Sequence, residues 1–251
     1  MKLKITVIVL LAAVVLSLHI VRRNSSPRGM QTTVNIGNGY ELMSQKEADS
    51  LLFVRFPDLM ETKIKNIDLQ AIKDYLESNP YIQSADVDIT TGGKLVIEIK
   101  QNIPVARMFY QGNEFYLSHQ NTIMPLSEKH YCNLIVGSCE VERANLEVDT
   151  NNYKIQIPEL SKIRALTAFL HDNSKYGDLF DQVIIDSTGD LILVPKLGDL
   201  TVVVGDTTRL DTKFKNLGVF FSQGINQVGW DSYSTINLKY KNQVVCTRRK
   251  N

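Results

Sequence analysis

The chain has few of the residues and motifs that most enzymes need. Its 251 residues include only three cysteines and four histidines, and no two cysteines form a Cys-x-x-Cys pair. The sequence also lacks a His-Glu-x-x-His helix, a phosphate-binding glycine loop and a Gly-x-Ser-x-Gly turn. These patterns are typical of zinc proteases, nucleotide-dependent enzymes and hydrolases. We therefore expect no catalytic residues, no metal site, no cofactor and no small-molecule substrate.

A strong excess of charge of either sign is also missing. The chain carries 28 basic and 27 acidic residues, a formal net charge of +1. Four of the basic residues and no acidic residue fall within positions 1–23, which leaves 24 basic and 27 acidic residues in the rest. Because a nucleic-acid-binding surface needs a clustered basic face, we expect no nucleic-acid partner. The short basic run at residues 248–250 favours a solvated tail over a binding patch.

One long apolar run stands near the N-terminus. Residues 5–21 carry no charge, at the short end of the length that crosses a membrane as a helix. A cleaved signal peptide is the alternative, but Leu18-His19-Ile20 makes a poor cleavage site. We expect an uncleaved anchor at residues 5–22 after a short cytoplasmic tail at residues 1–4, since long C-terminal domains are translocated largely regardless of flanking charge. The polar residues 23–31 predict a linker.

Residues 32–101 predict the order strand, helix, helix, strand, strand. Ser44 and Glu47 match a capping box, and Asp68 can cap the second helix because its carboxylate accepts from first-turn amides. Asn79-Pro80 ends that helix, since proline disfavours the helical conformation in the residue before it. Two alternating strands then predict a hairpin with one apolar face for the helix to cover. The apolar positions are Ala85, Val87, Ile89, Leu95, Ile97 and Ile99.

Several short motifs follow one another in an order typical of one known family. They are Asn79-Pro80-Tyr81-Ile82, the alternating strand that follows, and Pro104-Val105-Ala106. With the helix before them, they make the stretch from Ile67 to Met108 resemble the second half of a POTRA domain, in the version of the bacterial cell-division family FtsQ/DivIB. The family usually has an arginine just before the Pro-Val pair, where this chain has Asn102-Ile103. The resemblance implies a POTRA domain at residues 32–106.

From residue 107 onwards the pattern is mostly that of short strands between turns. The expected strands are 114–117, 134–137, 182–186, 191–195 and 200–205. The expected helices are 158–171 and one capped near Thr207 or Thr208, with Leu210, Phe214, Leu217 and Phe221 along one face. The sequence therefore predicts an α+β fold: a single N-terminal transmembrane helix, a POTRA domain (β-α-α-β-β), and a mainly antiparallel C-terminal β domain with helices packed on one face. This last domain is expected at residues 107–248, before a tail at 249–251.

The last expected element runs from Tyr233 to Arg248, with an interruption at residues 241–243. Its Asn237-Leu238-Lys239-Tyr240 run is similar to a motif near the C-terminus of the FtsQ family, with the family's Asp and Arg changed. In that family this edge binds the partners FtsB and FtsL by strand addition. The resemblance implies FtsB-like and FtsL-like partners here, and possible binding of other division proteins to the POTRA domain. The resemblance implies contacts by Tyr240, Asn242, Gln243 and, more loosely, Arg248. In strand addition, the alternating side chains from Val244 and Val245 to Arg248 would supply specificity.

Strand addition has a simple physical basis. An open sheet edge presents unpaired amides and carbonyls, which a partner strand can satisfy. Lys239 and Lys241 stand beside the expected edge, and we infer that they discourage self-pairing and favour an acidic partner.

The three cysteines leave two readings open. If the domain lies outside the cytoplasm, Cys132 and Cys139 could form a disulfide, with Cys246 left over. Alternatively, all three are small buried apolar side chains.

Taken together, these patterns predict a binding protein. We expect a non-catalytic single-pass inner-membrane scaffold of the division complex, with its N-terminus in the cytoplasm, most of its chain in the periplasm, and enrichment at the septum. The alternative is a POTRA-type component of envelope protein transport or outer-membrane assembly. That alternative predicts several POTRA repeats or a β-barrel, whereas this sequence has one POTRA copy. An anchored enzyme would need a convergent set of titratable residues, which the sequence does not show.

Overall fold

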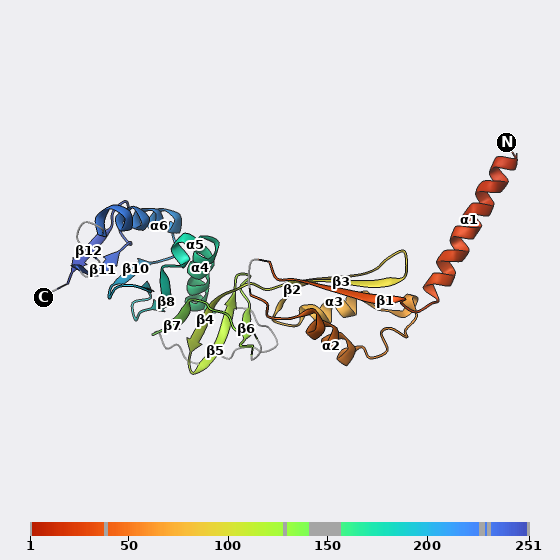
Figure 1. Cartoon of the computed structure of the whole chain (residues 1–251), viewed down its shortest axis with the longest axis horizontal. Coiled ribbons are helices and arrows are strands. Elements are labelled where there is room, and N and C mark those ends of the chain that lie inside the picture. The colour runs from red at the N-terminus through yellow and green to blue at the C-terminus, as the bar shows by residue number, and fades with distance from the viewer. Residues whose placement is uncertain are drawn as a thin grey trace. The chain divides into compact units, whose positions relative to one another are not determined.

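The computed structural model describes residues 2–37, 40–127, 130–140, 157–225, 229 and 232–249 (Figure 1). The chain divides into two compact units. The first consists of Met1–Gly37 and Glu41–Gln101, and the second of Asn38–Tyr40 and Asn102–Asn251. Each unit has its own cluster of buried apolar side chains, so each is described by itself.

The first unit begins with the long helix α1 (Lys2–Arg23). Its segment Ile5–Arg23 has a mean hydropathy of 2.5, and none of it is buried. Among the described residues it is the one helix long and apolar enough to cross a membrane. By length and composition, α1 is consistent with a single span.

The rest of the first unit follows the order expected from the sequence. Its elements are β1 (Gly29–Asn35), α2 (Gln45–Arg55), the short 3₁₀ helix η1 (Ile64–Asn66), α3 (Leu69–Glu77), β2 (Ile82–Ile89) and β3 (Lys94–Gln101). They form a sheet of order β1-β3-β2, in which β1 pairs parallel and β2 antiparallel with β3. The central strand β3 is therefore the last strand of the unit along the chain, and it pairs with β1 on one side and β2 on the other.

Both helix starts in this unit are fixed by the expected caps. The Ser44 hydroxyl accepts from the Glu47 amide, and the Glu47 carboxylate accepts from the Ser44 amide at 2.9 Å. The Asp68 carboxylate accepts from the Ala71 amide at 3.0 Å. These bonds satisfy amides that have no partner within the helix. Helix α3 then buries Ile72 and Leu76 in the cluster that β2 and β3 complete.

The expected linker at residues 23–31 is shorter in the structure. Helix α1 continues to Arg23, and β1 already begins at Gly29, three residues before the expected strand. Gly29 and Met30 pair with Lys94 and Leu95 of β3. Their strand conformation therefore comes from tertiary pairing, which the local sequence pattern does not reveal.

The second unit is built on one nine-stranded sheet. Its elements are β4 (Pro104–Tyr110), β5 (Asn113–Ser118), β6 (Ile123–Pro125), β7 (Val136–Cys139), α4 (Pro158–Asp172), α5 (Ser174–Gly177), β8 (Phe180–Ile185), β9 (Leu191–Pro195), β10 (Thr201–Gly205), α6 (Leu210–Val219), η2 (Phe220–Ile225), β11 (Tyr233–Asn237) and β12 (Val245–Arg248). The strand order is β12-β11-β10-β9-β8-β7-β4-β5-β6. Neighbouring strands are antiparallel except at β4–β7, β7–β8 and β10–β11, so the sheet is mixed with an antiparallel majority.

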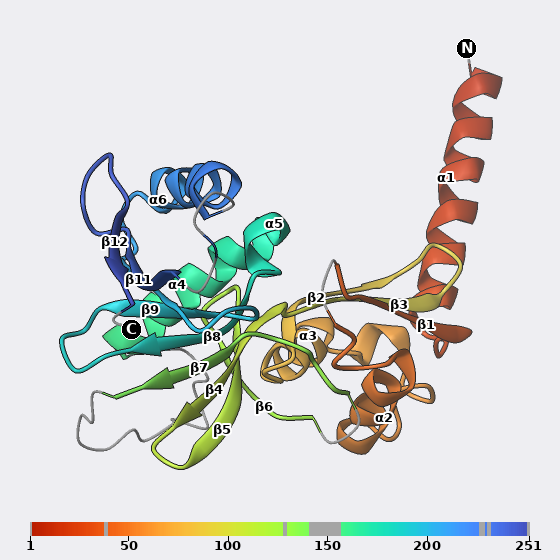
Figure 2. The same cartoon turned by 60° about the vertical axis from the view of Figure 1, so that its left-hand side comes forward.

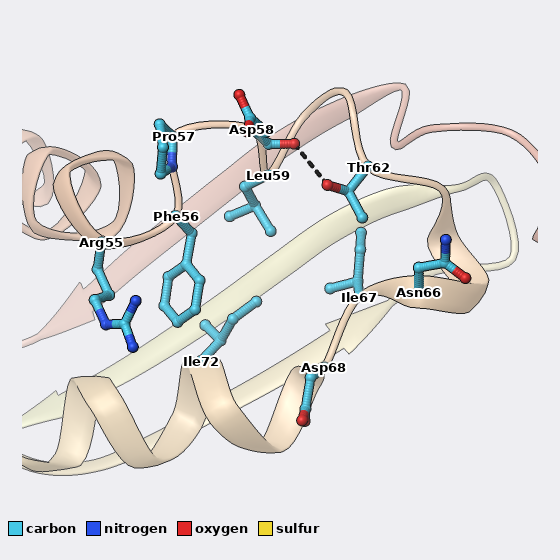
Figure 3. Close-up of a pocket in the computed structure, with 10 residues that line it drawn as sticks. All are labelled: Arg55, Phe56, Pro57, Asp58, Leu59, Thr62, Asn66, Ile67, Asp68 and Ile72. Carbon is cyan, nitrogen blue, oxygen red and sulfur yellow. Dashed lines mark hydrogen bonds between the residues drawn. The ribbon is translucent and has the colours of Figure 1, made fainter.

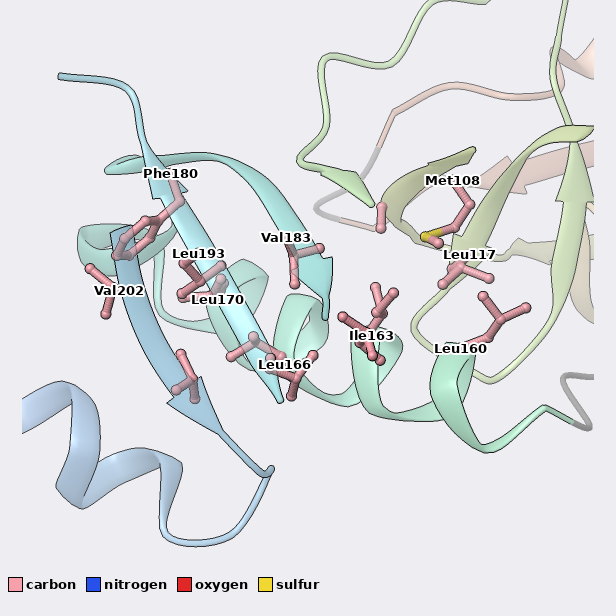
Figure 4. Packing of buried hydrophobic residues seen from close by; sticks show 14 of the residues in the cluster. Met108, Leu117, Leu160, Ile163, Leu166, Leu170, Phe180, Val183, Leu193 and Val202 are labelled. Carbon is pink, nitrogen blue, oxygen red and sulfur yellow. The ribbon is translucent and has the colours of Figure 1, made fainter. Parts of the chain in front are cut away.

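Helix α4 supplies much of the core of this unit (Figures 2 and 4). Its apolar positions recur every three or four residues, which places them along one helical face. They belong to the same buried cluster as side chains of β4, β5, β8, β9 and β10. The residues labelled in Figure 4 are Leu160, Ile163, Leu166 and Leu170 of the helix, and Met108, Leu117, Phe180, Val183, Leu193 and Val202 of the strands.

The strand expected at residues 134–137 lies two residues further along, as β7 (Val136–Cys139). The apolar run Leu134–Val136 suggested the earlier position, but pairing decides the strand: Val136 lies opposite Gln182 of β8, and Gly137 opposite Met108 of β4. A side chain at Gly137 would overlap the sulfur of Met108, which is fully buried. Glycine therefore leaves room for the side chains of Met108 in β4 and Ile163 in α4 to pack against β7.

We predict that Gly137→Ala destabilises the second unit by about 1–3 kcal/mol, because the added methyl group must displace the packed Met108 side chain. Thermal or urea unfolding of the full chain would measure the loss. Gly29→Ala in β1 is the matched control, since no atom lies within 4 Å of the new methyl group. Equal stability of the two variants would contradict the packing argument.

Candidate functional site

The outer edge of β12 is the most distinctive open feature of the second unit. Strand β12 is the terminal strand of the nine-stranded order and pairs only with β11 among the described strands. The pairs run from Tyr233 opposite Arg248 to Asn237 opposite Val245. A terminal strand presents a row of main-chain donors and acceptors on its outer side. The edge expected from the sequence is thus an edge in the structure.

The direction of individual main-chain groups on β12 follows from one hydrogen bond. The Arg249 amide donates to the Ser232 carbonyl at 3.1 Å, so it points inward toward the β11 side. Successive residues of a strand direct their main-chain groups to opposite sides. The amides and carbonyls of Cys246 and Arg248 therefore point to the open side, where an added strand would find them.

The side chains of the hairpin divide between the two faces of the sheet. Val244 and Cys246 pack against the buried cluster, and burial raises the pKa of the Cys246 thiol. Val245 is 40% exposed, and Thr247 and Arg248 are also exposed. On β12, therefore, some side chains pack on the core and anchor the strand, while others are exposed and open to contact.

The turn before β12 brings several expected contact residues to the surface. Tyr240 is 53% exposed, and Asn242 and Gln243 are exposed beside it. Asn242 has a positive φ of 60°, a conformation that asparagine tolerates better than most residues. Leu238 is 3% exposed and fixes the start of the turn in the core. The structure therefore places the expected residues on one hairpin; whether they bind a partner stays a prediction.

Lys239 does not contribute a free charge to this edge, contrary to expectation. Its ammonium donates to the Asp190 carboxylate, and this hydrogen bond and the acid's charge raise the pKa of Lys239. Asp190 lies 49 positions earlier, in the turn before β9, so the sequence pattern could not reveal the pair. Lys241 and Arg248 make no ion pair with the described residues, and they supply the open positive charge near the edge.

Arg249, which was expected in a solvated tail, contacts the sheet, whereas residues 250 and 251 lie outside the described residues. Arg249 donates from Nη1 to the Asp199 carboxylate at 2.9 Å and from its other terminal nitrogen to the Asp199 carbonyl. Asp199 belongs to the turn between β9 and β10. This contact ties the end of β12 to a different part of the sheet.

A buried lysine supports the same end of the sheet. Lys213 of α6 has a side chain that is 4% exposed and donates to the Asp206 carboxylate at 2.6 Å and to the Asp206 carbonyl at 2.8 Å. Asp206 also accepts from the Thr208 amide and hydroxyl. The expected cap at Thr207 or Thr208 is therefore wrong: Thr208 serves the Asp206 turn, and α6 begins after Arg209 without a side-chain cap.

Cys132 and Cys139, unlike Cys246, lie outside the β12 edge. The disulfide considered between Cys132 and Cys139 is not formed in the structure. Cys132 is buried, and burial raises the pKa of its thiol to about 11 despite a hydrogen bond with Tyr116. Such a thiol is weakly reactive, in keeping with a small buried side chain.

Two pockets are lined by residues outside the β12 edge. One, of about 330 Å³, lies in the first unit between the end of α2 and the start of α3 (Figure 3). Its polar contact, from the Thr62 hydroxyl to the Asp58 carbonyl, is an ordinary turn bond. The other, of about 660 Å³, lies beside His171 and Asp172 in the second unit. No group of three potential metal ligands occurs among the described residues.

Asp172, which lines the second pocket, contacts two histidines. Asp172 lies 3.0 Å from His119 and 3.3 Å from His171. Partial burial opposes ionisation of Asp172, but the two imidazoles outweigh it and lower the pKa of the carboxyl group. The contact between His119 and Asp172 joins the β5–β6 turn to the end of α4.

Comparison with known families finds a match to the family described as "FtsQ/DivIB, C-terminal related", over residues 103–247. The matched segment covers more than half of the chain and includes the sheet, α4, α6 and the hairpin of β11 and β12. A search of curated proteins finds no match.

The Asp206–Lys213 contact predicts a stability change in acid. Hydrogen bonds from Lys213 and, secondarily, from Thr208 lower the pKa of Asp206 from 3.8 to about 2. The carboxylate therefore stabilises the fold above pH 3.8, and this contribution is lost as the pH falls through about 2. Since Asp206 is 63% exposed, solvent screening reduces the contribution to about 1 kcal/mol.

We expect Asp206→Asn to lower the free energy of unfolding by about that amount at pH 7 and to flatten its decline between pH 4 and about 2. Melting curves across this pH range would measure both effects. Asp181→Asn is the control, because the Asp181 side chain is exposed and makes no hydrogen bond or ion pair with the described residues. Identical curves for the wild type and Asp206→Asn would exclude the contact.

Proposed function

The chain belongs to the FtsQ/DivIB C-terminal related family, and from this premise we propose that it is a membrane-anchored scaffold of the bacterial division complex. The family has a role in cell division and is one of non-catalytic scaffolds. The proposal for this chain is that it recruits and links its partners by β-strand addition at β12. The observation that carries it is the position of β12 at the end of the sheet, with its outer side open.

The proposed contact has two parts. Main-chain groups of Cys246 and Arg248 pair with an incoming strand, because both direct their amides outward. Exposed side chains on the turn and on β12 then contact the partner and select it. Val244 packs against the buried cluster and acts through its main chain. The proposed contact residues are Tyr240, Asn242, Gln243, Val244, Val245 and Arg248.

The proposed partners are FtsB-like and FtsL-like division proteins, as the family resemblance implies. The free cations at Lys241 and Arg248 favour acidic residues in the incoming segment, since opposite charges steer association and like charges oppose it. Lys239 takes no part in this preference, because Asp190 already neutralises it.

We propose that the part of the first unit after α1 is a POTRA domain, expected from the sequence at residues 32–106, and that other division proteins bind there. Its order of elements and its three-stranded sheet support this assignment. The last strand of the first unit ends at Gln101, and residues 104–106 belong to β4 of the second unit. We further propose that α1 spans the inner membrane once with its N-terminus in the cytoplasm, and that the POTRA domain and the β domain at 107–248 lie in the periplasm at the septum. The family match favours this division role over envelope transport.

Strand addition can be tested at one outward amide. We predict that Arg248→Pro weakens binding of an FtsB-like partner about tenfold or more, because proline removes an amide that the partner needs and leaves a carbonyl of the partner unpaired. The internal ladder is preserved, since the lost amide faces outward. Binding of the purified full chain to the partner would be measured by titration.

Arg248→Ala is the matched control, because it removes the side chain and retains the amide. A main-chain contact predicts a much smaller loss for Arg248→Ala than for Arg248→Pro. Equal losses would assign the effect to the guanidinium, and wild-type affinity in both variants would remove β12 from the interface.

The cellular role can be tested with a fluorescent protein fused to the N-terminus of the chain. We expect a midcell band in dividing cells for both the wild type and Arg248→Pro, with FtsB-like partners failing to arrive only in the variant. A diffuse envelope signal together with normal division would contradict the division role.

A further inference from the structure

Three segments of the first unit meet at the end of α1. The Arg22 guanidinium donates to the carbonyls of Ile89 and Thr90, at the turn between β2 and β3. The Ile64 amide of η1 donates to the Ser25 carbonyl at 2.9 Å. Figures 1 and 2 both show this turn beside the last residues of α1. These bonds fix the β2–β3 turn and η1 close to the point where the apolar helix ends.

The contact is close enough to be specific. The Arg28 amide donates to the Gly93 carbonyl at 2.9 Å. A side chain at Gly93 would lie within 4 Å of both Arg28 and Ile64, and Gly93 has a φ of +80° that favours glycine. The turn, η1 and the segment after α1 therefore form one packed surface.

This surface is rich in positive charge. The three segments that form it, residues 22–28, 60–66 and 88–94, contain six basic and two acidic residues. None of the six makes an ion pair with the described residues, although Arg22 donates to carbonyls and Lys94 to Gln31. We call these residues the juxtamembrane basic cluster: Arg22, Arg23, Arg28, Lys63, Lys65 and Lys94.

We propose that the juxtamembrane basic cluster binds the phosphate groups of anionic lipids and holds the first unit against the membrane surface. This inference rests on the proposed membrane span of α1. If residues 5–21 lie in the bilayer, Arg22 and Arg23 stand at its surface, and the bonds above bring Lys63, Lys65 and Lys94 to the same level. Lysine and arginine at an anionic surface each strengthen binding about fivefold. The site takes a lipid surface rather than a nucleic acid, since it adjoins the apolar helix directly.

The surface also has the polarity expected for a position at the headgroups. The tip of the β2–β3 turn is Thr90-Thr91-Gly92-Gly93, which has no large apolar side chain to insert into the acyl chains. Lys63 and Lys65 are exposed on either side of the partly buried Ile64. The cluster therefore binds at the headgroup level and leaves insertion to α1.

The test uses the full chain in lipid nanodiscs of phosphatidylcholine, with or without about one third phosphatidylglycerol. We expect hydrogen exchange in residues 60–66 and 88–94 to be about tenfold slower in the anionic discs. The effect should fall as ionic strength rises, because salt screens surface charge. Lys63→Gln/Lys65→Gln should abolish the difference between the two lipids.

Lys46→Gln/Lys100→Gln is the matched control. It removes two exposed charges from the same unit, away from the cluster, and should retain the lipid effect. Equal exchange in the two kinds of disc, with the protein still inserted, would overturn the lipid contact and leave the membrane span intact. Failure of the chain to insert would overturn the span and this inference together. Equal protection by inorganic phosphate in neutral discs would identify a phosphate site and overturn the lipid surface.

Discussion

Main-chain hydrogen bonding at the end of the sheet is the constraint on which the second unit depends. Each interior strand pairs with a neighbour on both sides, whereas the terminal strands β12 and β6 pair on one side only among the described strands. Water meets the other side in the isolated chain, and a strand that replaces that water gains bonds in a fixed register. An open sheet of this kind must end in such an edge, whereas a closed barrel has none.

The terminal hairpin is held in place by charges that come from elsewhere in the sheet. Asp190 binds Lys239 at the start of the turn, and Asp199 binds Arg249 just after β12. Asp190 lies in the turn before β9, and Asp199 lies in the turn after it. The hairpin of β11 and β12 is therefore held to the turns at both ends of β9. Exposed ion pairs contribute little to stability individually. Their effect here is to fix the position of the hairpin, so that its outer edge is a defined surface.

Local signals in the sequence predicted the local structure well. The caps at Ser44 and Asp68 and the alternation in β2 and β3 depend on neighbouring residues, and the structure confirms them. Tertiary pairing could not be read in the same way. It moved the start of β1 to Gly29 and the start of β7 to Val136, and it paired Lys239 with an acid 49 positions away. The edge was predictable because a family motif lies beside it. The neutralisation of Lys239 by Asp190 was not predictable, because the two residues are far apart in the sequence.

The attachment of β11 to the rest of the sheet has a thermodynamic consequence. Only three register positions join it to β10, from Thr201 opposite Thr235 to Val203 opposite Asn237, with one further bond from the Leu238 amide to the Val203 carbonyl. Strands with so few bonds can open locally at a lower free energy than the core. A ligand that binds only the closed hairpin raises that free energy by mass action. Partner affinity and the closure of this hairpin are therefore linked parts of one equilibrium.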